Sequence, residues 1–219
     1  MAEKWKIAPP AASCAAEDAY DINGAVRLAL EDGEDLYAKR FVAETLEAFD
    51  GQALDVSGCV FERCVFGEMD VKRISFADCV FDKCEWSNVR LANATFQRVK
   101  FRNCRMTGIE VLHGALMNTV FENCMMDYAS FSEAKLDRVT FDGCRLRESI
   151  WNEVRMPKAR FESTDLTKAQ WMRTPLAGQD MSSCNIDGWT VSLFDLRGIK
   201  LTAAQVISLS GLLGVEIVG

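Results

Sequence analysis

The chain has 219 residues, a length typical of one domain or of a domain with a small appendage. Apolar residues make up 49% of it and charged residues 26%, which excludes wholesale disorder and a collagen-like chain. The net charge of −7 argues against direct nucleic-acid binding through a basic surface. No apolar run approaches the roughly 18 to 20 residues of a membrane span, and no secretory signal is evident, so a cytoplasmic protein is expected.

The N-terminal quarter divides into two segments. Residues 1–14 contain Pro9-Pro10 and are expected to form a flexible arm. Residues 15–52 carry apolar residues at mostly helical spacing, with Gly33 as an interruption, so this segment is predicted to be an N-terminal cap of one or two short helices. The apolar residues of that pattern are Val26, Leu28, Leu30, Leu36, Phe41, Val42, Leu46 and Phe49.

From residue 53 to residue 201 the chain repeats every five residues. A large apolar residue, here called the centre, recurs from Phe61 to Leu201, and a second uncharged residue, the partner, lies two positions before each centre, from Cys59 to Ile199. None of these 58 residues is charged. Neither the 3.6-residue period of a helix nor the two-residue period of a strand gives this pattern. It predicts a short strand followed by a corner, repeated as a solenoid.

Four such pentads make one coil, because identical residues recur every 20 positions. Phenylalanine occupies the centre in six successive coils, and cysteine is the partner in five, beginning at Phe61 and Cys64. Such ladders are favoured where parallel strands stack about 4.8 Å apart. The repeat therefore predicts an all-β solenoid of about seven coils, with short helical caps at both ends.

Phrases such as Cys59-Val-Phe-Glu-Arg, Ala94-Thr-Phe-Gln-Arg and Ala159-Arg-Phe-Glu-Ser resemble the motif of pentapeptide-repeat proteins. The resemblance covers about two-thirds of the chain. It implies that the solenoid is a right-handed, quadrilateral parallel β-helix.

Residues 202–219 are predicted to close the other end. Thr202 and Gln205 have the spacing of a capping box, so a helix to about Ser210 is expected, followed by a closing strand over residues 213–218. The tail from Asp195 onward is similar to that of the Qnr-type quinolone-resistance proteins, and this similarity implies a homodimer through the C-terminal cap. The implied dimer contacts are Leu212, Leu213, Val215, Ile217 and Val218; a monomer with these residues folded under stays open.

The sequence offers little for catalysis or for a cofactor. Its regularly spaced cysteines are expected to be small buried hydrophobes, since they lie on the walls of a filled interior without the convergent geometry of a zinc site. His113, the single histidine, falls at an outward position, and no phosphate-binding glycine loop is present. We therefore expect no enzyme activity, no metal and no cofactor.

The outer surface remains as the functional candidate. An acidic column follows the centres at Glu62, Asp82, Glu122, Asp142 and Glu162, with Arg102 interrupting it. The first interpretation is a rigid, non-catalytic surface for a macromolecular partner. The second, implied by the resemblance, is a DNA mimic that binds type II topoisomerases, either DNA gyrase or topoisomerase IV, and protects them from fluoroquinolones. Residues 51–201 carry 20 basic and 20 acidic residues, and this neutrality is unfavourable to the mimic.

Overall fold

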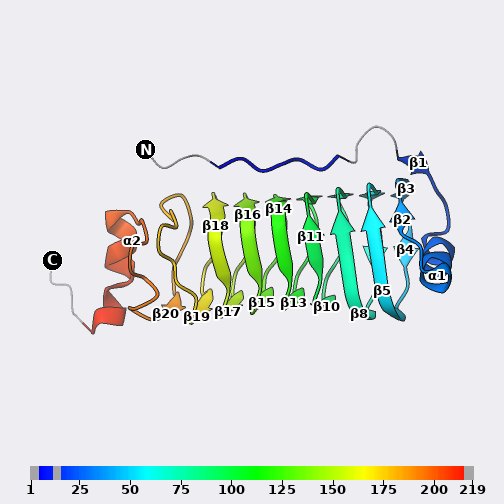
Figure 1. Cartoon of the computed structure of the whole chain (residues 1–219). Helices are drawn as coiled ribbons and strands as arrows, with labels where there is room; N and C mark the ends of the chain where they lie inside the picture. Colours follow the sequence, from blue (N-terminus) through cyan, green and yellow to red (C-terminus); the bar gives the residue numbers. More distant parts are fainter. Residues whose placement is uncertain (1–4, 12–15, 215–219) are drawn as a thin grey trace.

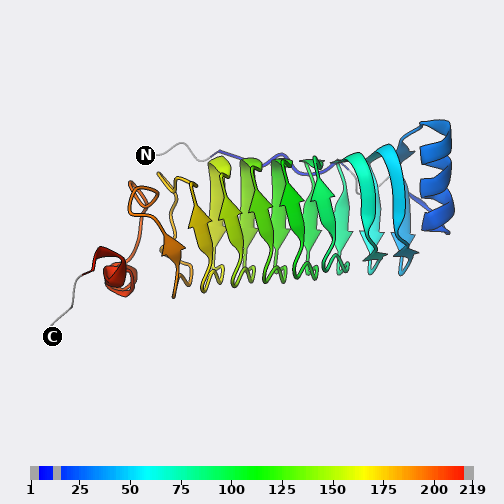
Figure 2. The ribbon, with the colours of Figure 1, turned by 90° about the horizontal axis from the view of Figure 1, so that it is seen from below.

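The computed structural model describes residues 5–11 and 16–214, with the side chains of Asp70, Val71 and Leu213 outside that description. It is a four-sided parallel β-solenoid of about nine turns, with one short helix near each end, and the predicted fold class is confirmed. Every strand pair in the solenoid is parallel and joins residues near 20 positions apart (Figures 1 and 2).

Two neighbouring faces belong to one large sheet. The phenylalanine face is the side of the column that holds the ladder of phenylalanine centres, and the β11 face precedes it around each coil. The longest strands continue around the corner from one face to the other. The phenylalanine face contains β3 (Lys39–Val42), β6 (Val60–Glu62), β9 (Val80–Asp82), β12 (Lys100–Arg102) and the second halves of β14 (Ala115–Glu122), β16 (Lys135–Asp142) and β18 (Arg155–Glu162). The β11 face contains β2 (Leu36–Tyr37), the second halves of β5 (Phe49–Ser57) and β8 (Met69–Ala77), β11 (Thr95–Gln97) and the first halves of β14, β16 and β18. The first halves of β5 and β8 lie on the preceding face.

The remaining two faces have shorter pairings. One is a six-stranded sheet of β10 (Arg90–Ala92), β13 (Glu110–Leu112), β15 (Ser130–Ser132), β17 (Ile150–Asn152), β19 (Gln170–Met172) and β20 (Thr190–Val191). The other starts with β4 (Thr45–Leu46) and β7 (Val65–Phe66) and continues as single bridges from Val65 to Asn185. Strand β1 (Glu17–Asp18) pairs with β3 at the edge of the first coil.

The interior consists of stacked identical side chains, as the five-residue repeat predicts. Phe61, Phe81, Phe101 and Phe121 are in register, and successive ring centroids are 4.8 to 4.9 Å apart. On the opposite side of the column, Phe131, Trp151 and Trp171 stack in the same way. Like rings at the coil spacing pack face to face without gaps, which is why the same residue recurs at position i+20.

The corners explain the two successive outward residues in each pentad. The second residue after the centre has a left-handed backbone at most corners, with φ between 46° and 60° at the non-glycine positions from Arg63 to Arg173. Asparagine tolerates this conformation better than most residues, and it recurs at Asn88, Asn93, Asn103, Asn118 and Asn123. The chain therefore turns at most corners without glycine.

The N-terminal cap is shorter than predicted. Helix α1 (Ile22–Asp32) covers the first coil and ends at Gly33, whose φ of 68° supplies the left-handed C-cap. The cap of one or two short helices was predicted over residues 15–52, but from Leu36 onward the chain forms strands, and Leu36 stacks on Val56. Two further centres, Phe41 and Leu46, pair with the coil above in the same way, so the solenoid starts about one coil earlier than residue 53.

The C-terminal cap begins as predicted. Helix α2 (Ala203–Ser208) has Thr202 as its N-cap, and Thr202 and Gln205 form the expected capping box. The Gln205 amide also donates to the carbonyls of Met181 and Cys184, both at 2.8 Å, which ties the helix to the last coils. A 3-10 turn, η1 (Ser210–Leu213), follows where the closing strand was expected to begin, and residues 215–219 lie outside the described part.

The repeat fails at one partner position near this end. Phe194 is predicted to point inward but is 68% exposed, while the neighbouring Asp195 is buried. The Ser192 hydroxyl donates to the Asp195 carboxylate at 2.7 Å and accepts from the Asp195 amide at 3.1 Å, forming a local turn. This turn shifts the inward position from residue 194 to residue 195, so the Phe194 ring points outward.

The described part of the N-terminal arm also differs from the expected loose segment. Residues 5–11 run along the outside of the column in an extended conformation, roughly parallel to its long axis (Figures 1 and 2). Three contacts connect this segment to different coils, through Trp5, Ala8 and Ala11.

Candidate partner-binding surface

The interior of the column is filled and leaves no room for a substrate in the two cavities that lie within it. Each has a volume of about 10 Å³, one lined by residues around Phe101 and the other by residues around Phe61. Such a volume holds one water at most. These two cavities therefore hold no substrate, which makes the outer surface and the ends of the described column the candidate sites.

The cysteine ladder has a structural explanation. Most of the inward thiols lie near the carbonyl oxygen 23 positions earlier, as with Cys84 and Phe61 at 3.3 Å. Threonine replaces cysteine at the partner position in other coils and makes the same bond, and the Thr164 hydroxyl donates to the Phe141 carbonyl at 3.1 Å. Because cysteine and threonine are interchangeable here, the ladder selects a small side chain with a weak donor.

Two of the thiols, Cys59 and Cys79, are also poorly suited to reactivity. Burial raises the pKa of Cys59 to about 11, and it raises the pKa of Cys79 further above the ordinary thiol range. A thiol in this state is not a nucleophile at neutral pH. Within residues 5–11 and 16–214, no three His, Cys, Asp or Glu side chains converge as metal ligands would.

The five predicted acidic residues lie on the phenylalanine face. The strand register places Glu62 beside Asp82, and Asp82 beside Arg102, on successive coils. The same register continues from Arg102 through the remaining members, Glu122, Asp142 and Glu162. The sequence therefore predicted their placement on one face, in a single column with one residue per coil.

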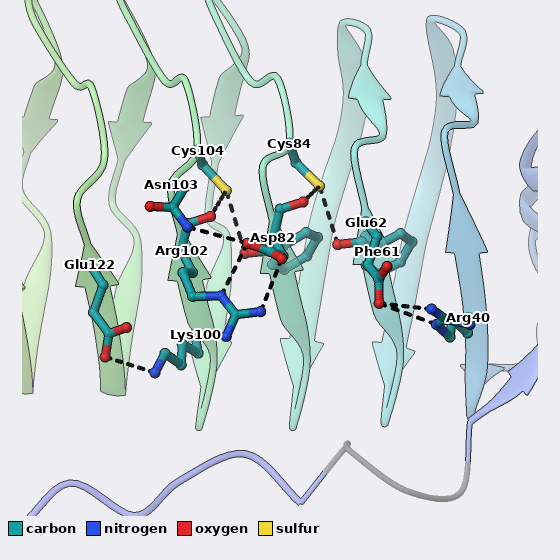
Figure 3. A network of polar contacts seen from close by, with 11 residues as sticks. Arg40, Phe61, Glu62, Asp82, Cys84, Lys100, Arg102, Asn103, Cys104 and Glu122 are labelled. Carbon is teal, nitrogen blue, oxygen red and sulfur yellow. Dashed lines mark hydrogen bonds and ion pairs between the residues drawn. The ribbon is translucent and has the colours of Figure 1, made fainter.

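Most of this acidic column is neutralised by neighbouring cations (Figure 3). Arg102 donates to both oxygens of Asp82, at 3.0 and 2.9 Å, and holds the pKa of that carboxyl below its ordinary value. Glu62 pairs with Arg40 at 3.0 Å, and Glu122 pairs with Lys100 at 2.7 Å.

The last two members of the column differ in their partners. Glu162 pairs with Arg160 at 3.3 Å. Among the described residues, Asp142 alone in the column lacks a cation within 4 Å. Most acids of the column are therefore paired with cations from the column or beside it, and its unpaired acid is Asp142.

Ion pairs one coil apart occur on other faces too, and the sequence analysis did not predict them. Arg98 holds Asp78 through both oxygens at 2.7 and 2.6 Å, and Arg173 pairs with Glu153 at 2.6 Å. They could have been predicted from opposite charges 20 residues apart in the sequence, because 20 residues make one coil. Most of these pairs are exposed and contribute about 0 to 1 kcal/mol each, so they shape the surface potential more than the stability.

His113 lies at an outward position, as predicted. It is half exposed, and its Nδ1 atom is 3.4 Å from a carboxylate oxygen of Glu133, again one coil away. No second histidine exists in the chain, so the pair resembles the other surface pairs rather than part of a catalytic group.

The predicted dimer contacts lie largely outside the described side chains. Leu212 is half buried and packs against the end of the core, whereas the Leu213 side chain and residues Val215, Ile217 and Val218 are not described. The structure instead shows four exposed apolar residues at this end that the sequence analysis did not select. They are Leu193, Phe194, Val206 and Ile207.

Neither helix within the described residues has the length and apolar character to cross a membrane.

A search of curated proteins finds no match. Among solved structures, a trypsin-treated form of QnrB1, a plasmid-mediated fluoroquinolone resistance protein, is 20% identical and covers 82% of this chain and 99% of its own, with a TM-score of 0.39.

Two cyanobacterial structures are similar as well. HetL from Nostoc sp. strain PCC 7120, a pentapeptide repeat protein involved in heterocyst differentiation regulation, is 11% identical, covering 76% of this chain and 86% of its own, with a TM-score of 0.32. Rfr23 from Cyanothece 51142 is 12% identical, covering 80% and 95%, with a TM-score of 0.25. The family model for the pentapeptide repeat region matches residues 55–117 and 112–171, together more than half of the chain. With its five-residue repeat and four-sided column, the chain belongs to the pentapeptide repeat protein family.

Proposed function

We propose that this protein is a non-catalytic, rigid binding surface for a macromolecular partner in the cytoplasm. The observation that carries the proposal is the contrast between a closed interior and a long, regularly charged exterior. Stacked rings fill the column, while ordered ion pairs at the coil spacing cover its outside. Such a surface is pre-organised, so a partner would bind it with little loss of conformational entropy.

The test is direct binding with one charge reversed on each of two faces. A partner captured from the source cell is purified, and its affinity for the wild-type column is measured by calorimetry. Glu122→Lys on the phenylalanine face is compared with Glu110→Lys on the six-stranded sheet that contains β13, since both residues are outward glutamates paired with a cation. We expect one of the two to weaken binding at least tenfold. Failure of any partner to bind at micromolar protein would contradict the proposal.

A second candidate is a DNA mimic that binds DNA gyrase or topoisomerase IV. Its support is the single-file acidic column on one face, from Glu62 to Glu162. The neighbouring cations weaken it, because duplex DNA presents a charge about every 1.7 Å of its axis and the column presents one acid per coil at most.

The gyrase candidate has its own assay. Purified protein is added to a gyrase supercoiling reaction with and without ciprofloxacin. Inhibition or protection that is lost in the double variant Glu122→Lys with Asp142→Lys would support the mimic, and the Glu110→Lys protein is the control. The absence of both effects at micromolar protein would eliminate it.

We also propose a homodimer through the C-terminal cap. The exposed Leu193, Phe194, Val206 and Ile207 support it, because large apolar side chains clustered at one end of a column usually mark a contact surface. Removing residues 212–219 is expected to give a monomer by light scattering. The double variant Val206→Ser with Ile207→Ser tests α2 separately, and a dimer that survives both changes would place the interface elsewhere.

A further inference from the structure

The extended N-terminal segment follows one corner of the column, where the β11 face meets the phenylalanine face. The Ala8 amide donates to Asn118 Oδ1 at 3.3 Å, and the Ala11 amide donates to Asp78 Oδ1 at 2.9 Å. Toward the other end, the Arg160 guanidinium lies 4.6 Å from the centre of the Trp5 ring. The segment therefore contacts three separate coils with seven residues.

The repeat of the segment matches the repeat of the column. Its contacts are three residues apart, and their partners on the column lie about two coils apart. Two coils span about 9.6 Å at the usual strand spacing, and three residues of polyproline II span about 9.3 Å. Pro9 and Pro10 fix φ near −65° and have no amide hydrogen, so the available donors fall on either side of them at Ala8 and Ala11.

The acceptors on the corner are held in place by the column. Asp78 and Asn118 occupy left-handed corner positions two coils apart, with φ of 55° and 51°. Arg98 donates to both carboxylate oxygens of Asp78, and Arg138 donates to Asn118 Oδ1 at 2.9 Å. The corner thus alternates an acceptor and an arginine, and each arginine orients the acceptor of the previous coil.

The surface beside this corner is partly apolar, although Lys100 and Arg160 belong to the same row of outward positions. The residue before each phenylalanine centre points out of the column, yet valine occupies it at Val60, Val80 and Val120. Val60 is only 9% exposed, and Thr140 in the same column is 8% exposed. Within the segment, Trp5 and Ile7 are half buried while Lys6 is exposed, so the large apolar side chains lie toward the column.

We propose that this corner is a docking site for an extended, proline-containing peptide, and that the N-terminal segment is its resident ligand. A partner segment with the same chemistry would displace it. Such a segment has an apolar or aromatic residue, followed by a proline pair that is flanked on both sides by backbone amides free to donate. The existence of such a partner rests on the proposed function. The docking site itself can be tested without a partner.

The experiment separates the segment from its column. A variant lacking residues 1–11 is titrated into a peptide of residues 5–11, acetylated, amidated and labelled with a fluorophore at the exposed Lys6, and binding is followed by anisotropy. We expect saturable binding to the truncated protein. The full chain should bind the peptide about tenfold more weakly, because the attached segment competes at a high effective concentration.

Two aspartates provide a matched control. Asp78→Ala and Asp82→Ala each remove a carboxylate that an arginine of the next coil holds through two bonds. Asp78 accepts from the segment, whereas Asp82 lies in the acidic column. In the truncated background we expect Asp78→Ala to weaken peptide binding about tenfold and Asp82→Ala to change it less than twofold. A peptide with Ala11→Pro, which keeps an extended backbone but loses the donor, should also bind about tenfold more weakly.

The outcomes separate clearly. No binding at 1 mM peptide by a truncated protein with a native circular dichroism spectrum would overturn the docking site, and equal losses in the two aspartate variants would overturn the role of Asp78. If the truncated protein does not fold, amide exchange of Ala11 in the full chain decides instead. We expect faster exchange in Asp78→Ala than in Asp82→Ala, and equal rates would refute the proposal. Peptide binding without any cellular partner would leave the site intact and count against the proposed function alone.

Discussion

Replacing Phe101 with alanine tests how much the stacked interior contributes to stability. The ring is 1% exposed, and its centroid lies 4.8 Å from that of Phe81 and 4.9 Å from that of Phe121. Truncating a buried phenylalanine costs about 3 to 5 kcal/mol. Because two stacked contacts are lost at once, each worth about 0.5 to 1.5 kcal/mol, we place the loss at the upper end, about 5 kcal/mol.

Urea unfolding followed by circular dichroism measures this loss. With a slope of about 3 kcal/mol per molar urea, the midpoint should fall by about 1.5 to 2 M. Phe101→Leu retains most of the volume and should lose about 1.5 kcal/mol at most, and Tyr20→Ala removes an exposed ring and should lose about 0.5 kcal/mol or less. Phe101→Glu is expected not to fold, because the core has no partner for a carboxylate. A loss below about 1 kcal/mol for Phe101→Ala would refute the reasoning.

Two further predictions concern the C-terminal cap and the surface pairs. Thr202→Ala removes the N-cap of α2 and should cost about 1 kcal/mol, seen as roughly fivefold faster amide exchange in α2; unchanged exchange would contradict the capping role. Arg98 and Arg102 lower the pKa values of Asp78 and Asp82. Their stabilisation is present above the unfolded aspartate pKa of about 3.9 and is lost as pH falls through the lower folded values. The wild-type urea midpoint should therefore fall more between pH 5 and pH 2.5 than that of the double variant Asp78→Asn with Asp82→Asn, and equal falls would contradict this.

The repeat could be read from the sequence wherever its inward positions stayed uncharged. That condition fails in the first coil, where Lys39 and Glu44 occupy partner positions and Gly51 occupies a centre. Both charged side chains remain partly exposed, and Lys39 pairs with Glu17 of the neighbouring strand β1. The centres at Leu36 and Phe41 were consequently attributed to a helix, although they stack on the coil above.

The surface was less predictable because its properties depend on pairs rather than on single residues. The acidic column was identified correctly as a column, but Arg40 and Lys100 approach it from neighbouring outward positions and cancel much of its charge. The docking of the N-terminal segment depends on a match between two spacings, one of the coil and one of an extended chain. Neither spacing is visible in the segment alone, where Pro9-Pro10 indicates only the absence of a helix.

Thiol reactivity tests the central claim, that two residues of every pentad line a closed column and the other three form its surface. The eight cysteines from Cys59 to Cys184 are all buried in the structure. In the native protein we predict that at most one of the nine thiols of the chain reacts with 5,5′-dithiobis(2-nitrobenzoate) within minutes, and that all nine react once urea unfolds it. Rapid reaction of several thiols in the native protein would show that these positions face water, and the account of the column would fail.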